Sequence, residues 1–196
     1  MATHSTRQDW GSIARTLHWL SAALILSGLV HGYWMANMLP RPERLPHYAW
    51  HSAIFLYFGL LLALRIVWRL QEVIPEPPRD SNRLEQSAAH IGHLALYGLM
   101  IALLVTGYMN WSAFPARFDP ARAAQMELSV FGIFKVPALH TVLNRDVFKF
   151  WEGAHMYLAW TMAGLTVVHV LAALRHHFIK GNDVLRRMLT GQTSTG

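Results

Sequence analysis

The segment HMYLAWTMAGLTVVHVLAAL, residues 155–174, contains no Asp, Glu, Lys or Arg, and the charge-free window around it begins at Gly153. About 20 largely apolar residues are enough to cross a bilayer as an α-helix. This window has 22 residues and therefore predicts a membrane-spanning helix, which we place at residues 150–178. His155 and His169 stand inside it, and an ionisable side chain at membrane depth is a candidate functional residue.

Three more charge-free windows precede this one. They cover residues 16–40, 45–64 and 86–116, and contain 25, 20 and 31 residues. The composition agrees, because only 14% of the residues are charged, against about 25% in a typical soluble domain. We therefore predict an all-α, multi-pass transmembrane four-helix bundle that forms a single domain over residues 1–196, with the first three helices at 12–35, 48–70 and 87–110.

Cysteine is absent from the 196 residues. This excludes disulfides, thiolate metal sites, Cys-ligated iron–sulfur clusters, a Cys nucleophile and the covalent CxxCH attachment of c-type haem. The net charge of +6 favours basic loops that face anionic membrane lipid, and not a nucleic-acid partner.

The basic residues predict the orientation in the membrane. Ten lie on the side of the two termini: Arg7, Arg15, Arg65, Arg69, Arg79, Arg83, Arg175, Lys180, Arg186 and Arg187. Seven lie on the other side: Arg41, Arg44, Arg117, Arg122, Lys135, Arg145 and Lys149. Five of these seven fall in the long connector 111–149, and long loops count little in the positive-inside rule. Both termini are therefore expected in the cytoplasm. In that connector FPARFDPARAAQ reads as loop, and FGIFKVPAL is apolar enough to lie on the membrane surface.

The two histidines of the last helix share one face. They are 14 residues apart, which is about 40° short of four full turns and about 21 Å along the helix axis. This spacing places one site toward each membrane surface and fits two haems. A zinc site would need its ligands within a few ångströms of one another.

Antiparallel helices select the second axial ligand of each haem. His18 lies near the inner end of the first helix, level with His169, and His51 lies near the outer end of the second helix, level with His155. The expected pairs are therefore His18 with His169 and His51 with His155. Two axial imidazoles fill the coordination of the iron and favour electron transfer over oxygen binding.

Other polar residues leave alternatives open. One alternative is that His18 and His31 are both haem ligands on the first helix. They are 13 residues apart, about 140° short of four turns, so their side chains face nearly opposite ways. His47 and His51 form an HxxxH spacing typical of a zinc pair, but no Glu general base stands nearby. His90 and His93 either contact a haem propionate or quinone headgroup or make ordinary interfacial hydrogen bonds. The guanidinium groups of Arg15 and Arg65 either pair with haem propionates or anchor the inner surface.

These features resemble the bacterial cytochrome b561 family of small dihaem membrane cytochromes. The resemblance runs from about Arg7 to Leu189 through RTLHWLSA, HYAWHSAIF, AAHIGHLALYGLMIALLVTGY and HMYLAWTMAGLTVVHVLAALRHHFIKGNDVLRRML. It implies two b-type haems with bis-histidine ligation and electron transfer linked to quinone, in the respiratory chain of the bacterial cytoplasmic (inner) membrane. The ligands of the family fall on His18, His51, His155 and His169.

Three functions follow from these observations. The first is transfer of electrons between an outer-side partner and the quinone pool, and its most concrete version is an enzyme that oxidises superoxide with ubiquinone as acceptor. The second is a non-enzymatic haem-carrying subunit or anchor for a hydrogenase or dehydrogenase partner. The third is a histidine-based metal transporter, which would need intramembrane carboxylates, and the four windows contain none.

Overall fold

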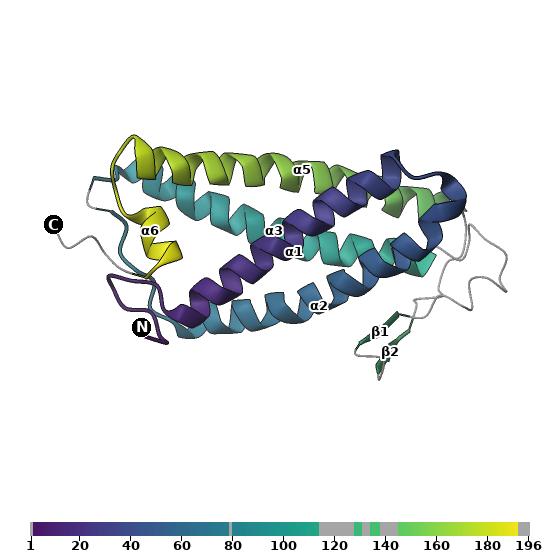
Figure 1. Cartoon of the computed structure of the whole chain (residues 1–196), viewed down its shortest axis with the longest axis horizontal. Helices are drawn as coiled ribbons and strands as arrows, with labels where there is room; N and C mark the ends of the chain where they lie inside the picture. The colour runs from purple at the N-terminus through teal and green to yellow at the C-terminus, as the bar shows by residue number, and fades with distance from the viewer. Residues whose placement is uncertain (1, 79, 114–127, 131–133, 138–144, 192–196) are drawn as a thin grey trace. The chain divides into compact units, whose positions relative to one another are not determined.

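The computed structural model describes residues 2–78, 80–113, 128–130, 134–137 and 145–191. Four long helices dominate the described chain (Figure 1), and their bounds are α1 Ser12–Asn37, α2 Arg44–Gln71, α3 Arg83–Ala113 and α5 Arg145–Phe178. Each of these helices is long and apolar enough to cross a membrane. The expectation of an all-α fold with four membrane-spanning helices is confirmed.

Three of the four long helices begin four or five residues earlier than predicted, whereas α1 begins at Ser12, as predicted. Helix α2 starts at Arg44 and not at residue 48, directly after the short 3-10 helix η1, Arg41–Glu43. Pro42 and Pro46 do not prevent this, because proline in a first helical turn lacks only an N–H that would have no partner there. Pro42 and Pro46 therefore mark helix starts.

The connector 111–149 is shorter than expected and contains strands. Helix α3 continues to Ala113, and α5 begins at Arg145. Between them β1, Leu128–Val130, pairs antiparallel with β2, Phe134–Val136. The FPARFDPARAAQ segment, with Arg117 and Arg122, lies outside the described residues, as do parts of FGIFKVPAL. The expected position of FGIFKVPAL on the membrane surface stays a prediction.

The chain divides into two compact units, each of which takes part of every long helix. Unit 1 comprises Met1–Ala23, Leu61–Tyr97 and Gly164–Gly196. Unit 2 comprises Leu24–Leu60 and Gly98–Ala163. The most buried large side chains of unit 2 are Phe58 and Met162, each 1% exposed, and in unit 1 Leu62 is 2% exposed. His18 and His169 fall in unit 1, and His51 and His155 fall in unit 2.

Large apolar side chains cover much of the outside of the helices. Examples are Trp50, 66% exposed, Val30, 69% exposed, and Leu84, 81% exposed. Soluble proteins rarely expose continuous apolar surface of this kind, whereas lipid requires it. The exposed surface therefore supports the membrane assignment independently of helix length.

In unit 1 the N-terminal segment and the short helix α6, Val184–Leu189, pack against the start of α1 (Figure 1). The indole nitrogen of Trp19 donates to the carbonyl of Met188 at 3.0 Å, and the guanidinium of Arg15 donates to the carbonyl of Leu189 at 2.9 Å. These bonds satisfy carbonyl groups at the C-terminal end of α6, where an isolated helix leaves them without partners.

Candidate functional site

The histidine pair of unit 1 joins α1 to α5. The ring centres of His18 and His169 are 6.3 Å apart, and the ring planes are inclined at 52°. Arg65 of α2 donates from Nη2 to Nδ1 of His18 at 2.9 Å. His93 of α3 lies beside the same pair, with its ring centre 5.5 Å from that of His169. All four long helices therefore contribute a polar side chain to this part of unit 1.

The histidine pair of unit 2 joins α2 to α5. The ring centres of His51 and His155 are 6.2 Å apart and their planes are perpendicular, at 90°. The pair lines a cavity of about 670 Å³ whose wall includes Ile25, Phe55 and Leu103. Sites for cofactors typically have volumes of about 300–1,000 Å³ and are mostly apolar, so this cavity has the size and the wall of a cofactor site.

Both ring separations fit a metal ion between two imidazoles. Two metal–nitrogen bonds of about 2 Å each, plus the distance from each nitrogen to the centre of its ring, give about 6 Å between ring centres. The observed separations are 6.2 and 6.3 Å. The described residues contain no cluster of three or more His, Cys, Asp or Glu that could hold a metal ion. Paired imidazoles in an apolar wall suit haem iron, whose other four ligands come from the macrocycle, better than zinc.

Two glycines fit closely against the ligand pair of unit 2. A Cβ on Gly32 of α1 would lie 3.3 Å from Cε1 of His51, and a Cβ on Gly107 of α3 would lie 3.2 Å from Cε1 of His155. Most real Cβ contacts are longer than this, so any larger residue would displace the imidazole. The ring that approaches Gly107 is therefore that of His155.

Comparison with known proteins agrees with this architecture. The family model described as "Prokaryotic cytochrome b561" matches residues 9–191. Cytochrome b561 homolog 2 of Escherichia coli K12 is 34% identical over 203 residues, an alignment that covers 100% of this chain and 98% of the relative. The chain belongs to the prokaryotic cytochrome b561 family. A protein of Yersinia pestis named "Probable superoxide oxidase CybB" is 23% identical over 184 residues, with 88% of this chain and 91% of that protein covered.

Membership in the cytochrome b561 family has a direct chemical consequence. The chain is a membrane electron-transfer protein of a family that carries b-type haem. The cavity of unit 2 fits such a group on two counts, its facing imidazoles and its apolar wall with glycines. In unit 1 the fit rests on the imidazole pair alone. Arg65 donates to Nδ1 of His18, so its guanidinium would have to turn away before Nδ1 could carry the ring hydrogen and Nε2 could bind a metal ion.

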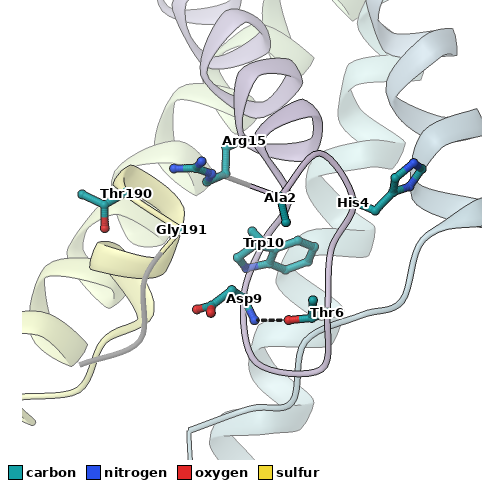
Figure 2. A pocket seen from close by; sticks show the side chains of 8 residues that line it. All are labelled: Ala2, His4, Thr6, Asp9, Trp10, Arg15, Thr190 and Gly191. Carbon is teal, nitrogen blue, oxygen red and sulfur yellow. Dashed lines mark hydrogen bonds between the residues drawn. The ribbon is translucent and has the colours of Figure 1, made fainter. Parts of the chain in front are cut away.

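The guanidinium of Arg15, which was expected to pair with a haem propionate, contacts the end of helix α6. In Figure 2 its guanidinium points toward Gly191, and the surrounding pocket of about 290 Å³ is also lined by Asp9 and Trp10. Gly191 has a φ of +70°, and a Cβ there would lie 2.8 Å from Cζ of Arg15. The side chain therefore holds the end of α6, while Arg65 contacts His18. A propionate role for Arg15 stays a prediction, and Arg65 is better placed for it.

The sequence analysis missed two basic residues at the cavity of unit 2. Arg44 of α2 and Lys149 of α5 line the same cavity as the histidine pair. Arg44 stands seven residues before His51, close to two helical turns, so the sequence could have placed these two side chains on one helix face. Lys149 stands six residues before His155, about 120° away around the helix, so no spacing signal connected these two.

The remaining histidines fall into local contacts. His31 Nε2 lies 3.4 Å from His47 Nδ1, and the His31 ring centre is 5.8 Å from that of His51. Trp34 packs edge-on against His47 at 4.9 Å. His31 therefore lies within unit 2, whereas its rival partner His18 lies in unit 1. At the end of α5 the amide of Asn182 donates to His176 at 2.9 Å, which fits a surface role.

Proposed function

We propose that the chain binds two haems b without covalent attachment, one in each unit. His18 and His169 would hold the first, and His51 and His155 the second. The observation that carries this proposal is the separation of about 6 Å between the ring centres of each pair, because it matches two metal–nitrogen bonds to one metal ion. We retain the single membrane domain and the cytoplasmic position of both termini as parts of the proposal.

The chain's own residues hold and shield the cofactor. The four imidazoles would hold the iron, and apolar residues such as Phe55 and Leu103 would exclude water from the cavity of unit 2. Arg44 and Lys149 in unit 2, and Arg65 in unit 1, offer cations for the propionate carboxylates. When bound, haem supplies one-electron redox chemistry at its iron.

The proposed activity is oxidation of superoxide on the outer side of the bacterial inner membrane, with a quinone such as ubiquinone as acceptor. Each superoxide anion loses one electron and becomes oxygen; two electrons and two protons convert the quinone to a quinol. Support comes from the name of the Yersinia pestis relative and from the basic side chains Arg44 and Lys149 at the cavity, which would attract an anion.

One purified preparation tests the proposal in two steps. Haem content is measured first, after extraction with acid acetone, and the expected result is two haems per chain with none left on the polypeptide. Superoxide and a soluble quinone are then added to the protein alone, and quinol formation above the uncatalysed rate is expected. Two haems without quinol formation would favour an electron-transfer subunit that serves a partner protein, and a single haem would contradict the ligand assignment.

A further inference from the structure

We propose that Thr106 is a positioning residue for His155, whose ring it holds with Nε2 free for the iron. The inference rests on the proposed haem ligation. It goes beyond that ligation, because it explains how the unit 2 site selects one of the two neutral forms of a ligand imidazole. Thr106 lies on α3 and His155 on α5, and both belong to unit 2.

The hydrogen positions follow from what each atom can do. Oγ1 of Thr106 is 2.7 Å from the carbonyl oxygen of Ala102 and 3.1 Å from Nδ1 of His155. A carbonyl oxygen can only accept, so the single hydroxyl hydrogen of Thr106 is donated to Ala102. The hydroxyl oxygen must then accept from His155, which requires the hydrogen on Nδ1. In neutral imidazole this leaves the lone pair on Nε2, the form that binds a metal ion.

The contact is buried and shaped around the ring. Thr106 is only 7% exposed, so water does not compete for its hydroxyl. The next residue, Gly107, leaves room for the imidazole edge, because a Cβ there would lie 3.5 Å from Nδ1 of His155. The backbone carbonyl of Leu103, one turn earlier on α3, also interacts with this imidazole. Helix α3 thus offers the imidazole of His155 two hydrogen-bond acceptors, Thr106 and the Leu103 carbonyl, and the space that Gly107 leaves open.

His51, the other candidate ligand of unit 2, lacks a comparable hydrogen bond in the part of the chain that the structure describes. Nδ1 of His51 is buried and has no hydrogen-bond partner among the described residues. A metal-bound histidine usually donates its second N–H to an acceptor, which fixes the ring and makes it a stronger electron donor. Thr106 supplies this effect to His155, and stronger donation from His155 stabilises ferric iron. We therefore expect Thr106 to lower the reduction potential of the unit 2 haem.

The test compares Thr106→Val, Thr106→Ser and Thr161→Val in the full-length haem-loaded protein. Thr161 is the matched control, because its hydroxyl on α5 donates to the Tyr157 carbonyl at 2.9 Å and is exposed. The readouts are haem content, the potential of each haem, the ferric EPR spectrum and the rate of haem transfer to apomyoglobin. The perpendicular rings of His51 and His155 predict a more anisotropic low-spin EPR signal than the 52° pair, which distinguishes the two haems.

We expect Thr106→Val to keep both haems, because the Leu103 carbonyl remains, but to change one of them. The more anisotropic signal should shift, the potential of that haem should rise, and its transfer to apomyoglobin should be about 10-fold faster. Thr106→Ser keeps the hydroxyl and should restore all three properties. Thr161→Val should match the wild type. If the Val variant does not accumulate, Thr106→Ala takes its place, with the same expectations.

Four results would overturn the inference. Wild-type spectra, potentials and transfer rates in the Val or Ala variant would show that the hydroxyl has no effect on the haem. A Ser variant that behaves like the Val variant would assign the effect to packing. In both cases a wild-type protein with two haems leaves the proposed function standing. A wild-type protein with fewer than two haems, or an unchanged His155→Ala variant, would refute the proposed function and this inference together.

Discussion

At the residue scale, the four candidate ligands differ in what surrounds them. His18 faces a guanidinium, His155 a hydroxyl and a glycine, and His51 a glycine without a hydrogen-bond partner for Nδ1 among the described residues. These surroundings separate two sites that look equivalent in the sequence.

The four ligand variants should form two spectral classes. His18→Ala and His169→Ala should each lose or loosen the haem of unit 1 and keep that of unit 2, so haem content falls by about half; His51→Ala and His155→Ala should do the reverse. His31→Ala should keep two low-spin haems, because the His31 ring contacts His47 and His51 without belonging to either pair. Dithionite-reduced difference spectra with haem quantitation measure this. Loss of a haem in His31→Ala with both retained in His51→Ala would support the rival pairing.

Gly107→Ala should loosen the haem of unit 2. The added methyl group would lie 3.2 Å from Cε1 of His155, so the ring must move by a few tenths of an ångström or the helices must separate. Overpacking of this kind typically costs about 1–3 kcal/mol. Gly98→Ala is the matched control on the same helix, because a Cβ there meets no atom within 4 Å. Thermal release of haem, followed by the loss of Soret absorbance, should occur at lower temperature only in the first variant.

At the element scale, the N-terminal segment is fastened to the end of α2 by a carboxylate. The carboxylate of Glu72 accepts hydrogen bonds from the backbone N–H of Ser5 and from the ring of His4. In addition, the backbone carbonyl oxygen of Arg7 accepts a hydrogen bond from the N–H of Glu76 at 2.8 Å. The carboxylate thus replaces the regular hydrogen bonds that the non-helical segment 2–10 lacks. The Glu72 carboxylate and a backbone hydrogen bond therefore hold the N-terminal segment to the end of α2.

The attachment of residues 2–10 to the end of α2 should depend on pH. Burial raises the pKa of Glu72, but the hydrogen bonds from Ser5 and His4 outweigh burial, so the pKa lies below its ordinary value of 4.5. A group whose folded-state pKa is lowered stabilises the fold above its unfolded pKa, and loses this effect as pH falls through the folded value. The hydrogen-exchange protection factors of residues 2–10, taken relative to the intrinsic rate at each pH, should therefore be high at neutral pH and low well below pH 4.5. In Glu72→Gln, exchange should be fast at neutral pH as well; slow exchange in that variant would disprove the role of the carboxylate.

At the scale of the whole molecule, the apolar helices, the exposed aliphatic and aromatic side chains and the family match agree on a membrane protein. The ion pairs of the described chain lie at helix ends, where Glu85 pairs with Arg175 at 3.0 Å and with Lys180 at 2.6 Å. Charges near these ends meet water and lipid headgroups, and the basic ones determine which end stays in the cytoplasm.

Both termini should face the cytoplasm, because basic residues gather on their side of the chain. A green fluorescent protein fused after Gly196 should fluoresce, and alkaline phosphatase fused at the same point should be inactive, since each reporter works in one compartment only. A fusion in the 71–86 connector should give the same pattern, and a fusion in the 36–47 connector the opposite one. Phosphatase activity after Gly196 would indicate an odd number of spans and would require a new assignment of the histidine pairs.

The sequence alone predicted four long apolar helices, which the structure has, and indicated four histidines as candidate ligands, because both follow from rules that act along the chain. Hydrophobic length sets a span, and the phase of His155 and His169 along one helix is fixed by 3.6 residues per turn. Helix starts were less predictable, as Pro46 shows, because a proline is compatible with either a loop or a first helical turn.

Only the tertiary structure identified what surrounds each histidine. Thr106 and Gly107 lie 49 and 48 positions before His155, and Arg65 lies 47 positions after His18, so no local spacing connects them. Their contacts depend on the rotation and approach of neighbouring helices, to which side chains all along each helix contribute. The sequence therefore determined which residues could hold a cofactor, and the packing of the helices decided which atoms orient them.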